Sequence, residues 1–336
     1  MKHIVSGIKP SGDLNLGTYL GAIKNFVGLQ EAYQDHHFFL FIADLHAITV
    51  KQDPQKLKAA TKSLAAMYLA CGLKEERLSL FVQSEIPAHA QMNYYLQTFA
   101  YMGELERMTQ YKDKAQKQES GVSSALFTYP VLMAGDILLY DAEYVPVGDD
   151  QKQHLELTRD LAIRINNRFG DLFTIPKPII PKVGARIMGL QNPTKKMSKS
   201  DTNVKDIIYL LDPPNIIEKR LKSAVTDSEG VVRFDPSEKP GISNLITIYA
   251  ALESLSIEAT EALFKEASYA DFKHAVAEKV IAHLTPIQER YHALLASDEL
   301  DEILNRGRDE AAKIATKKAQ TLAKRLGLGR TIKQSR

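Results

Sequence analysis

Apolar residues in the first half of the chain follow two alternating patterns. Short apolar runs at 4–8, 38–43, 78–82 and 143–147 predict buried strands. After the first run, apolar residues recur at spacings of four, three and four, which predicts a helix over about 16–33. These residues are Leu16, Leu20, Ile23 and Val27. Repeated alternation of strands and helices predicts an α/β fold in which helices cover a parallel sheet, with ligands bound at the carboxyl ends of the strands.

A second helix is predicted to begin at Asp53 and Pro54, because aspartate is a favoured N-cap and proline suits the first helical position. Its apolar stripe consists of Leu57, Ala60, Leu64, Tyr68 and Cys71. Cys71 is the only cysteine. We therefore predict that its thiol is a core group and that no disulfide forms within the chain.

The strand pattern fades after about residue 203. Helices are predicted at 214–224, 242–255, 257–267, 270–295, 298–306 and 310–326. We therefore expect an α/β domain over 1–203 and a helical domain over 204–336, and leave open whether the last residues return to the first domain.

The composition is that of a globular protein with a core, since 44% of residues are hydrophobic and 25% are charged. No apolar run approaches the roughly 20 residues that a membrane helix needs, and the start of the chain shows no signal-peptide pattern. The surroundings of Cys71 offer no metal-ligand spacing. We expect a cytoplasmic protein with no membrane partner and no protein-bound metal.

The net charge is only +2, but positive charge gathers at the end of the chain, where residues 311–336 hold eight basic residues and no acidic one. They are Lys313, Lys317, Lys318, Lys324, Arg325, Arg330, Lys333 and Arg336. Basic ends often contact phosphate backbones, although a solvated helix face has the same composition.

The first strand is followed by a loop and then by a helix that carries Gly17 and Gly21, four residues apart. Their shared face has no side chains, so a flat group such as adenine could approach the backbone there. The start of the helix offers free N–H groups and a partial positive charge to phosphates. Glycines also suit a tight turn or close packing, and this segment alone does not decide between the two interpretations.

The loop at 193–200 ends in Lys196-Met197-Ser198-Lys199-Ser200. Its composition alone is typical of a basic surface loop. The intact string KMSKS, however, resembles the ATP-phosphate loop of class I aminoacyl-tRNA synthetases. The resemblance implies that all five residues bind ATP, and that Lys196, Ser198 and Lys199 are catalytic. Their positive charge would meet the negative charge that develops on the α-phosphate and the departing pyrophosphate.

Three other segments resemble the ATP site of the same family. Asn15-Leu16-Gly17-Thr18 occupies the position of its HIGH motif, which implies ATP contacts for Asn15, Gly17 and Thr18 and a catalytic role for Thr18. The preceding Lys9, Pro10 and Ser11 would also contact ATP, with Lys9 in a position where bacterial tryptophan-specific members usually have glutamine. Gly148-Asp149-Asp150-Gln151 resembles the ribose-binding GxDQ motif, and Ile187 would lie against ATP. The two aspartates could equally cap a helix at 152–169, and the two roles are compatible.

The apolar segment 127–140 is interrupted by Asp136, and a buried carboxylate needs a hydrogen-bond donor. An Arg or Lys from another helix is one candidate donor, and the N–H of a bound indole is the other. The segment resembles the side-chain pocket of bacterial tryptophanyl-tRNA synthetases. That likeness implies tryptophan contacts for Asp136, Met133, Tyr129, Gln151, His46 and Val5, with Val5 replacing a phenylalanine that is frequent in the family.

The resemblance covers nearly the whole chain. It implies a Rossmann-like catalytic domain, a helical domain that reads the tRNA anticodon, and a homodimer. The implied activity is conversion of L-tryptophan and ATP to tryptophanyl-adenylate and transfer to tRNA(Trp), with Mg²⁺ carried by the ATP phosphates. The alternatives are a tyrosyl-tRNA synthetase, a catalytically reduced regulator that binds tRNA or tryptophan, and a nucleotidylyltransferase without a tRNA partner.

Overall fold

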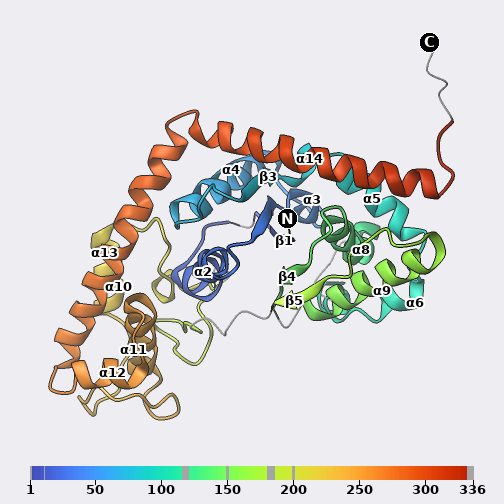
Figure 1. Ribbon diagram of the computed structural model, residues 1–336. Helices are drawn as coiled ribbons and strands as arrows, with labels where there is room; N and C mark the ends of the chain where they lie inside the picture. The colour runs from blue at the N-terminus through green and yellow to red at the C-terminus, as the bar shows by residue number, and fades with distance from the viewer. Residues whose placement is uncertain are drawn as a thin grey trace.

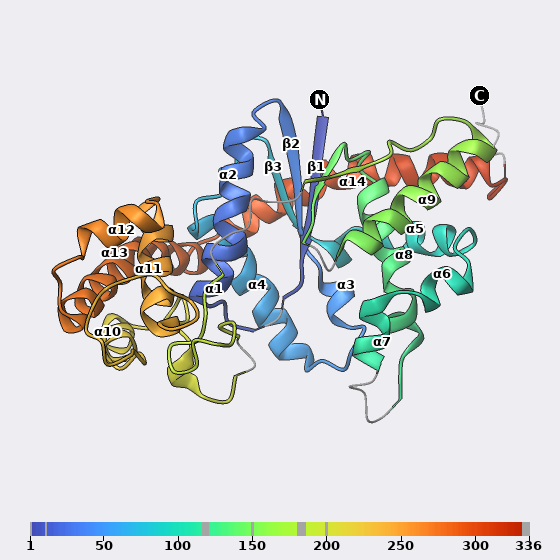
Figure 2. The ribbon, with the colours of Figure 1, turned by 90° about the horizontal axis from the view of Figure 1, so that it is seen from below.

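A parallel five-stranded sheet forms the centre of the protein, with strand order β3-β2-β1-β4-β5 (Figures 1 and 2). The computed structural model describes residues 2–10, 12–115, 121–148, 151–179, 186–198 and 201–330. The strands are β1 (Lys2–Ile8), β2 (His36–Ile42), β3 (Leu78–Val82), β4 (Tyr144–Pro146) and β5 (Lys177–Ile179). The predicted parallel sheet is confirmed, and β5 is an additional strand too short to be revealed by a hydrophobic pattern.

Helices cover both faces of the sheet (Figure 2). One face packs against α2 (Lys24–Ala32) and α4 (Pro54–Ala70), and the other packs against α5, α8 and α9. The bounds of these three helices are α5 (Ala88–Gln97), α8 (Ser124–Leu138) and α9 (Lys152–Phe169). This part also contains the short helices α3 (Asp44–Ala47), α6 (Met102–Glu106) and α7 (Thr109–Ala115).

The first predicted helix is formed in three pieces. α1 (Leu16–Thr18) is followed by a π-helical turn over Tyr19–Ile23, and α2 continues from there. Hydrophobic spacing does not reveal this turn, because the apolar residues still face the core on both sides of it. Single π-helical turns are rare and are frequent at functional sites.

The predicted start of α4 is confirmed, because the Asp53 side chain accepts a hydrogen bond from the Lys56 N–H at 2.9 Å and Pro54 is the first helical residue. Cys71 directly follows the helix and is buried, as predicted. Burial raises the pKa of its thiol to about 12, which keeps it protonated and unreactive.

The second half of the chain is helical, as predicted (Figure 1). It contains α10 (Pro214–Lys222), α11 (Pro240–Glu253), α12 (Ile257–Leu263), α13 (Tyr269–Leu295) and α14 (Glu299–Arg325). The prediction of two helices at 298–306 and 310–326 is wrong, since α14 is one continuous helix. Gly307 lies in the gap that was predicted between them, and a Cβ there would collide with the backbone of Leu80 in β3, so close packing explains the glycine.

α14 runs back from the helical bundle along β3 towards α5 (Figure 1). The Ser79 hydroxyl of β3 donates to the Glu310 carboxylate at 2.8 Å. Near the end of α14, Lys318 forms an ion pair with Asp141 at 2.5 Å. The interpretation of all eight basic residues as uncompensated is therefore wrong for Lys318, whereas Lys333 and Arg336 lie outside the described residues.

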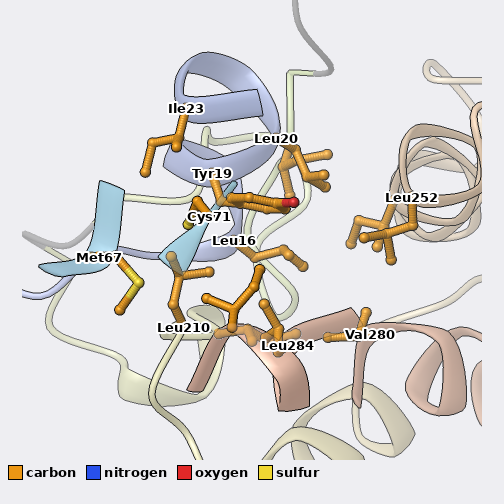
Figure 3. Close-up of a cluster of buried hydrophobic side chains, with 14 of the residues drawn as sticks. Leu16, Tyr19, Leu20, Ile23, Met67, Cys71, Leu210, Leu252, Val280 and Leu284 are labelled. Atoms are coloured by element: carbon orange, nitrogen blue, oxygen red, sulfur yellow. The ribbon is translucent and has the colours of Figure 1, made fainter. Parts of the chain in front are cut away.

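One apolar core joins the sheet to the helical bundle. Figure 3 shows Leu16, Tyr19 and Leu20 of the first helix facing Leu252 of α11 and Val280 and Leu284 of α13. The first helix thus lies between the sheet and the bundle, and both fix its position. Among the described residues, no helix is long and apolar enough to cross a membrane.

Candidate active site

A cavity of about 260 Å³ opens at the carboxyl ends of β1, β2 and β4. This is the edge of the sheet at which a ligand was expected. The cavity walls include all six residues predicted to contact the amino acid, namely Val5, His46, Tyr129, Met133, Asp136 and Gln151. The fold thus collects around one space side chains that come from β1, α3, α8 and the start of α9.

Asp136 lies on the wall of this cavity with 1% of its surface exposed. Its Oδ1 accepts from Gln83 Nε2 and from His89 Nδ1, each at 2.7 Å, and its Oδ2 accepts from His46 Nε2 at 2.8 Å. The expectation of an Arg or Lys donor is wrong, because an amide and two imidazoles supply the hydrogen bonds. Burial raises the pKa of Asp136, but the bonds from His46 and His89 outweigh it and lower this pKa to about 2.

A second buried layer fixes His89 in turn. A carboxylate only accepts hydrogen bonds, so His89 Nδ1 carries a proton. In the neutral ring Nε2 then accepts from the Tyr140 hydroxyl, 2.8 Å away. Tyr140 is fully buried and stacks on Phe39 with ring centroids 4.6 Å apart. Asp136 Oδ1 is thereby saturated, and Oδ2 keeps acceptor capacity for a ligand.

A second polar network lines the same cavity, beginning at Tyr129, which lies two turns before Asp136 on α8. The Tyr129 hydroxyl donates to the Gln110 side-chain carbonyl at 3.1 Å and is hydrogen-bonded to His154 Nε2 at 3.0 Å. The other ring nitrogen of His154 is 3.0 Å from Gln151 Oε1. These oxygens suit a positively charged donor such as an ammonium group. Lys9 also lines the cavity, and partial burial lowers the pKa of its amine.

At the start of the first helix, Asn15 is the N-cap. Its Oδ1 accepts from the Thr18 N–H at 2.8 Å and from the Thr18 hydroxyl at 3.0 Å. Thr18, expected to donate to phosphate, donates to Asn15 in this arrangement. Pro10 is buried before this turn, and Ser11 lies outside the described residues.

The stem of the ATP loop, which we define as residues 187–189 and 195–197, covers Gly17. A Cβ at Gly17 would lie 3.5 Å from the Cβ atoms of Ile187 and Met197. Both side chains are buried and lie against Gly17 at ordinary van der Waals distance. Lys196 is exposed and Ser198 is half-buried, while Lys199 and Ser200 lie outside the described residues.

The GxDQ-like segment is described only at its ends. Gly148 is exposed, and its carbonyl accepts from the Gln151 N–H at 3.0 Å. α9 begins at Lys152 as predicted, with Gln151 in the N-cap position and no side-chain cap bond from it. Asp149 and Asp150, the predicted cap and ribose contacts, lie outside the described residues.

Gln83, His89 and Gln110 were not predicted as site residues from the sequence. Gln83 directly follows β3, so its place at the carboxyl end of a strand was an available signal. His89 and Gln110 lie on helices, and nothing in their local pattern marks them. Among the described residues, no group of three or more His, Cys, Asp or Glu side chains could hold a metal ion.

The arrangement combines three functions at one edge of a sheet. An ionised carboxylate lies on the wall of a mainly apolar cavity, side-chain oxygens of Tyr129 and Gln151 line the same cavity, and a lysine-bearing loop packs against the start of the first helix. The family model for class I tRNA synthetases (W and Y) matches residues 2–285. The chain belongs to this class.

Curated relatives narrow the assignment. The chain is 58% identical over 330 residues to the tryptophan–tRNA ligase of Oceanobacillus iheyensis, covering 98% of this chain and 100% of that protein. It is 55% identical over 327 residues to the tryptophan–tRNA ligase of Bacillus subtilis, covering 97% and 98%. Within its class the chain therefore groups with the bacterial tryptophan–tRNA ligases.

Solved structures agree with this grouping. The tryptophanyl-tRNA synthetase of Mycoplasma pneumoniae has a TM-score of 0.83 and 39% identity, with 98% of each chain covered. That of Campylobacter jejuni, complexed with ADP and tryptophan, has a TM-score of 0.83 and 36% identity, covering 97% of this chain and 100% of that one. A tyrosyl-tRNA synthetase from Aeropyrum pernix, at 21% identity and a TM-score of 0.64, shares the fold.

Proposed function

We propose that the protein activates L-tryptophan with ATP and transfers it to tRNA(Trp). In the first step a carboxylate oxygen of tryptophan attacks the α-phosphorus of ATP, which gives tryptophanyl-adenylate and pyrophosphate. In the second step a ribose hydroxyl at the end of the tRNA attacks the activated carbonyl, and AMP leaves. The cavity around the buried, ionised Asp136 is the observation that carries this proposal.

The indole N–H would donate to Asp136 Oδ2, which already accepts from His46. The indole ring would lie against Met133 and Val5, which line the same cavity. The ammonium group would donate to Tyr129 and Gln151, which line the same cavity. A carboxylate that only accepts suits tryptophan and leaves phenylalanine, which has no ring donor, without a matching group.

ATP would lie between the first helix and the ATP loop. Its contacts would come from Lys9, Pro10, Ser11, Asn15, Gly17, Thr18, Gly148, Asp149, Asp150, Ile187 and the loop residues Lys196, Met197, Ser198, Lys199 and Ser200. Lys196 and Lys199 would neutralise charge on the phosphates as pyrophosphate leaves, with Ser198 and Thr18 as hydrogen-bond donors. Mg²⁺ would arrive on the phosphates of ATP and supply further positive charge there.

The helical domain would contact the anticodon end of the tRNA, and the exposed lysines of α14 would add phosphate contacts. We further propose that two copies form a homodimer and that the protein works in the cytoplasm, where its buried thiol stays reduced.

ATP–pyrophosphate exchange with tryptophan, tyrosine and phenylalanine, each tested separately, examines the first step. We expect exchange with tryptophan and little with the other two. Exchange that depends on tyrosine would instead identify the alternative enzyme of the same class. Exchange without charging of tRNA(Trp) would contradict the second step alone.

A further inference from the structure

The stem of the ATP loop is a short antiparallel ribbon. Met188 and Lys196 form a bridge, the Gly189 N–H donates to the Lys195 carbonyl at 2.9 Å, and the Met197 N–H donates to the Ile187 carbonyl at 3.0 Å. An isolated two-stranded ribbon is marginally stable in water. The position of Lys196 therefore depends on what holds the ribbon from outside.

Asn244 of α11 holds the ribbon at Met188. Its Oδ1 accepts from the Met188 N–H at 2.8 Å, and its Nδ2 donates to the Met188 carbonyl at 2.9 Å. A side-chain amide offers a donor and an acceptor side by side, as a neighbouring backbone does, so Asn244 replaces the strand that the ribbon lacks. Asn244 is 4% exposed, and competition from water for these two bonds is correspondingly weak.

Asp206 holds the turn that follows Met188. Its Oδ1 accepts from the N–H groups of Gln191 and Asn192, the latter at 2.8 Å. The carboxylate lies so close to Gly189 that a Cβ there would collide with it. Asp206, like Asn244, is buried and comes from the second half of the chain. Asn244 thus holds the stem itself, and Asp206 holds the turn between its two strands.

The opposite side of the stem rests on the first helix. Ile187 and Met197 cover Gly17, and the next residues of that helix pack against α11 and α13 (Figure 3). The stem therefore lies between the helix that begins the ATP site and the bundle proposed to read tRNA. The contact with Gly17 is apolar and can slide, whereas the contact with Asn244 is directional and cannot.

We propose that Asn244 is a positioning residue through which the helical bundle sets the place of Lys196 at the ATP phosphates. This inference rests on the proposed adenylate chemistry. A shift of α11 relative to the first helix would carry Met188 with it, and the bridge to Lys196 would pass the shift to the loop. Displacement of a reacting group by about 1 Å can cost about 100-fold in rate.

Asn244→Leu tests the proposal, with Asn166→Leu as its matched control. Asn166 of α9 makes the same pair of bonds to Phe173, donating to its carbonyl at 2.8 Å and accepting from its N–H at 2.9 Å, on the side of the sheet away from the ATP loop. We expect both variants to lose thermal stability. Only Asn244→Leu should lower the rate of tryptophan-dependent pyrophosphate exchange, by about 10- to 100-fold, with an unchanged dissociation constant for tryptophan.

A double variant separates positioning from general damage. If Asn244 acts through Lys196, then Lys196→Ala should lower the exchange rate by a smaller factor in the Asn244→Leu protein than in the wild type. Equal factors in both backgrounds, or a wild-type rate in Asn244→Leu, would overturn the proposal. If Asn244→Leu does not fold at the assay temperature, Asn244→Asp, which keeps the acceptor for Met188, takes its place in every measurement.

Limited digestion with trypsin gives a readout that does not depend on activity. We expect faster cleavage at Lys195 and Lys196 in Asn244→Leu, and an unchanged rate in Asn166→Leu. If the wild-type protein showed no pyrophosphate exchange with any of the three amino acids, the proposed function would be contradicted. The digestion would still decide whether Asn244 holds the loop. Equal cleavage of both variants would contradict the positioning role.

Discussion

Three side chains hold the carboxylate of the amino-acid cavity, whereas the described part of the ATP loop carries an exposed lysine on a two-stranded stem. Asp136 receives three hydrogen bonds from side chains on three different elements. Lys196, in contrast, is exposed and lies on a short ribbon that Asn244 holds at Met188 and Asp206 holds at the turn. A selective site needs an acceptor that does not adapt to the wrong ligand, because adaptation would lower the cost of binding it.

The ATP loop has a different task. Negative charge develops on the phosphates only as the reaction proceeds. A positive group that interacts more strongly with the transition state than with bound ATP lowers the activation barrier, whereas one that binds both equally does not. A fixed stem with an exposed lysine fits this task. The comparison therefore predicts that variants of the cavity change selectivity, and that variants of the loop change rate.

Asp136→Ala should have the largest effect. Sites built to pair a polar group reject analogues that lack it by about 10⁴- to 10⁵-fold, so we expect the preference for tryptophan over phenylalanine to fall by at least about 100-fold. Competition calorimetry with the two amino acids measures this ratio. Asp171→Ala, an exposed carboxylate on the surface, is the control. An unchanged ratio in Asp136→Ala would show that Asp136 is structural.

Lys196→Ala should lower the rate of adenylate formation by about 100- to 1,000-fold, which corresponds to a decrease of about 2.7–4 kcal/mol in transition-state stabilisation. Tryptophan affinity should not change. Single-turnover activation measures the rate, and Lys195→Ala is the matched control, because side chains alternate along the ribbon and this lysine faces the other way. If both variants slow the reaction equally, net charge explains the decrease and the assignment of Lys196 fails.

Asp136 should also link stability to pH. Its pKa of about 2 lies below the ordinary value of 3.8, so its contribution to stability is complete above about pH 4 and is lost as the pH falls through 2. The difference amounts to about 2 kcal/mol. Thermal unfolding between pH 5 and pH 2 should therefore be less pH-dependent in Asp136→Asn than in the wild type. The same slope in both proteins would mean that other carboxylates carry the acid sensitivity.

The smallest effect is expected at the end of α14, where Lys313, Lys317 and Lys324 are exposed. Gln at all three positions should weaken tRNA binding and reduce the slope of log affinity against log salt by roughly 0.7–0.9 for each phosphate that is no longer neutralised. Pyrophosphate exchange should be unaffected. Gln at Lys51, Lys56 and Lys58 changes the net charge equally and serves as the control. Wild-type affinity and slope in the α14 variant would mean that this helix face is only solvated.

Short-range signals in the sequence determined most of the secondary structure of this protein and part of its core. The alternation of apolar runs and helical stripes predicted the parallel sheet, Asp53 and Pro54 predicted the start of α4, and the stripe that ends at Cys71 predicted a buried thiol. Each helix, strand and cap in this prediction is marked by residues that are close together in the sequence. The loop at Lys196 was recognised in the same way, since its five residues are contiguous.

Only the tertiary structure decided what surrounds these features. The partners of Asp136 are 47, 53 and 90 residues away in the chain, and Asn244 is 56 residues from Met188. The sequence predicted a gap between helices at 307–309, yet α14 continues through Gly307 and the backbone of β3 lies against it. Burial and hydrogen-bond partners depend on which surfaces meet when the chain folds, and a local pattern of residue types carries no information about a surface that is distant in sequence.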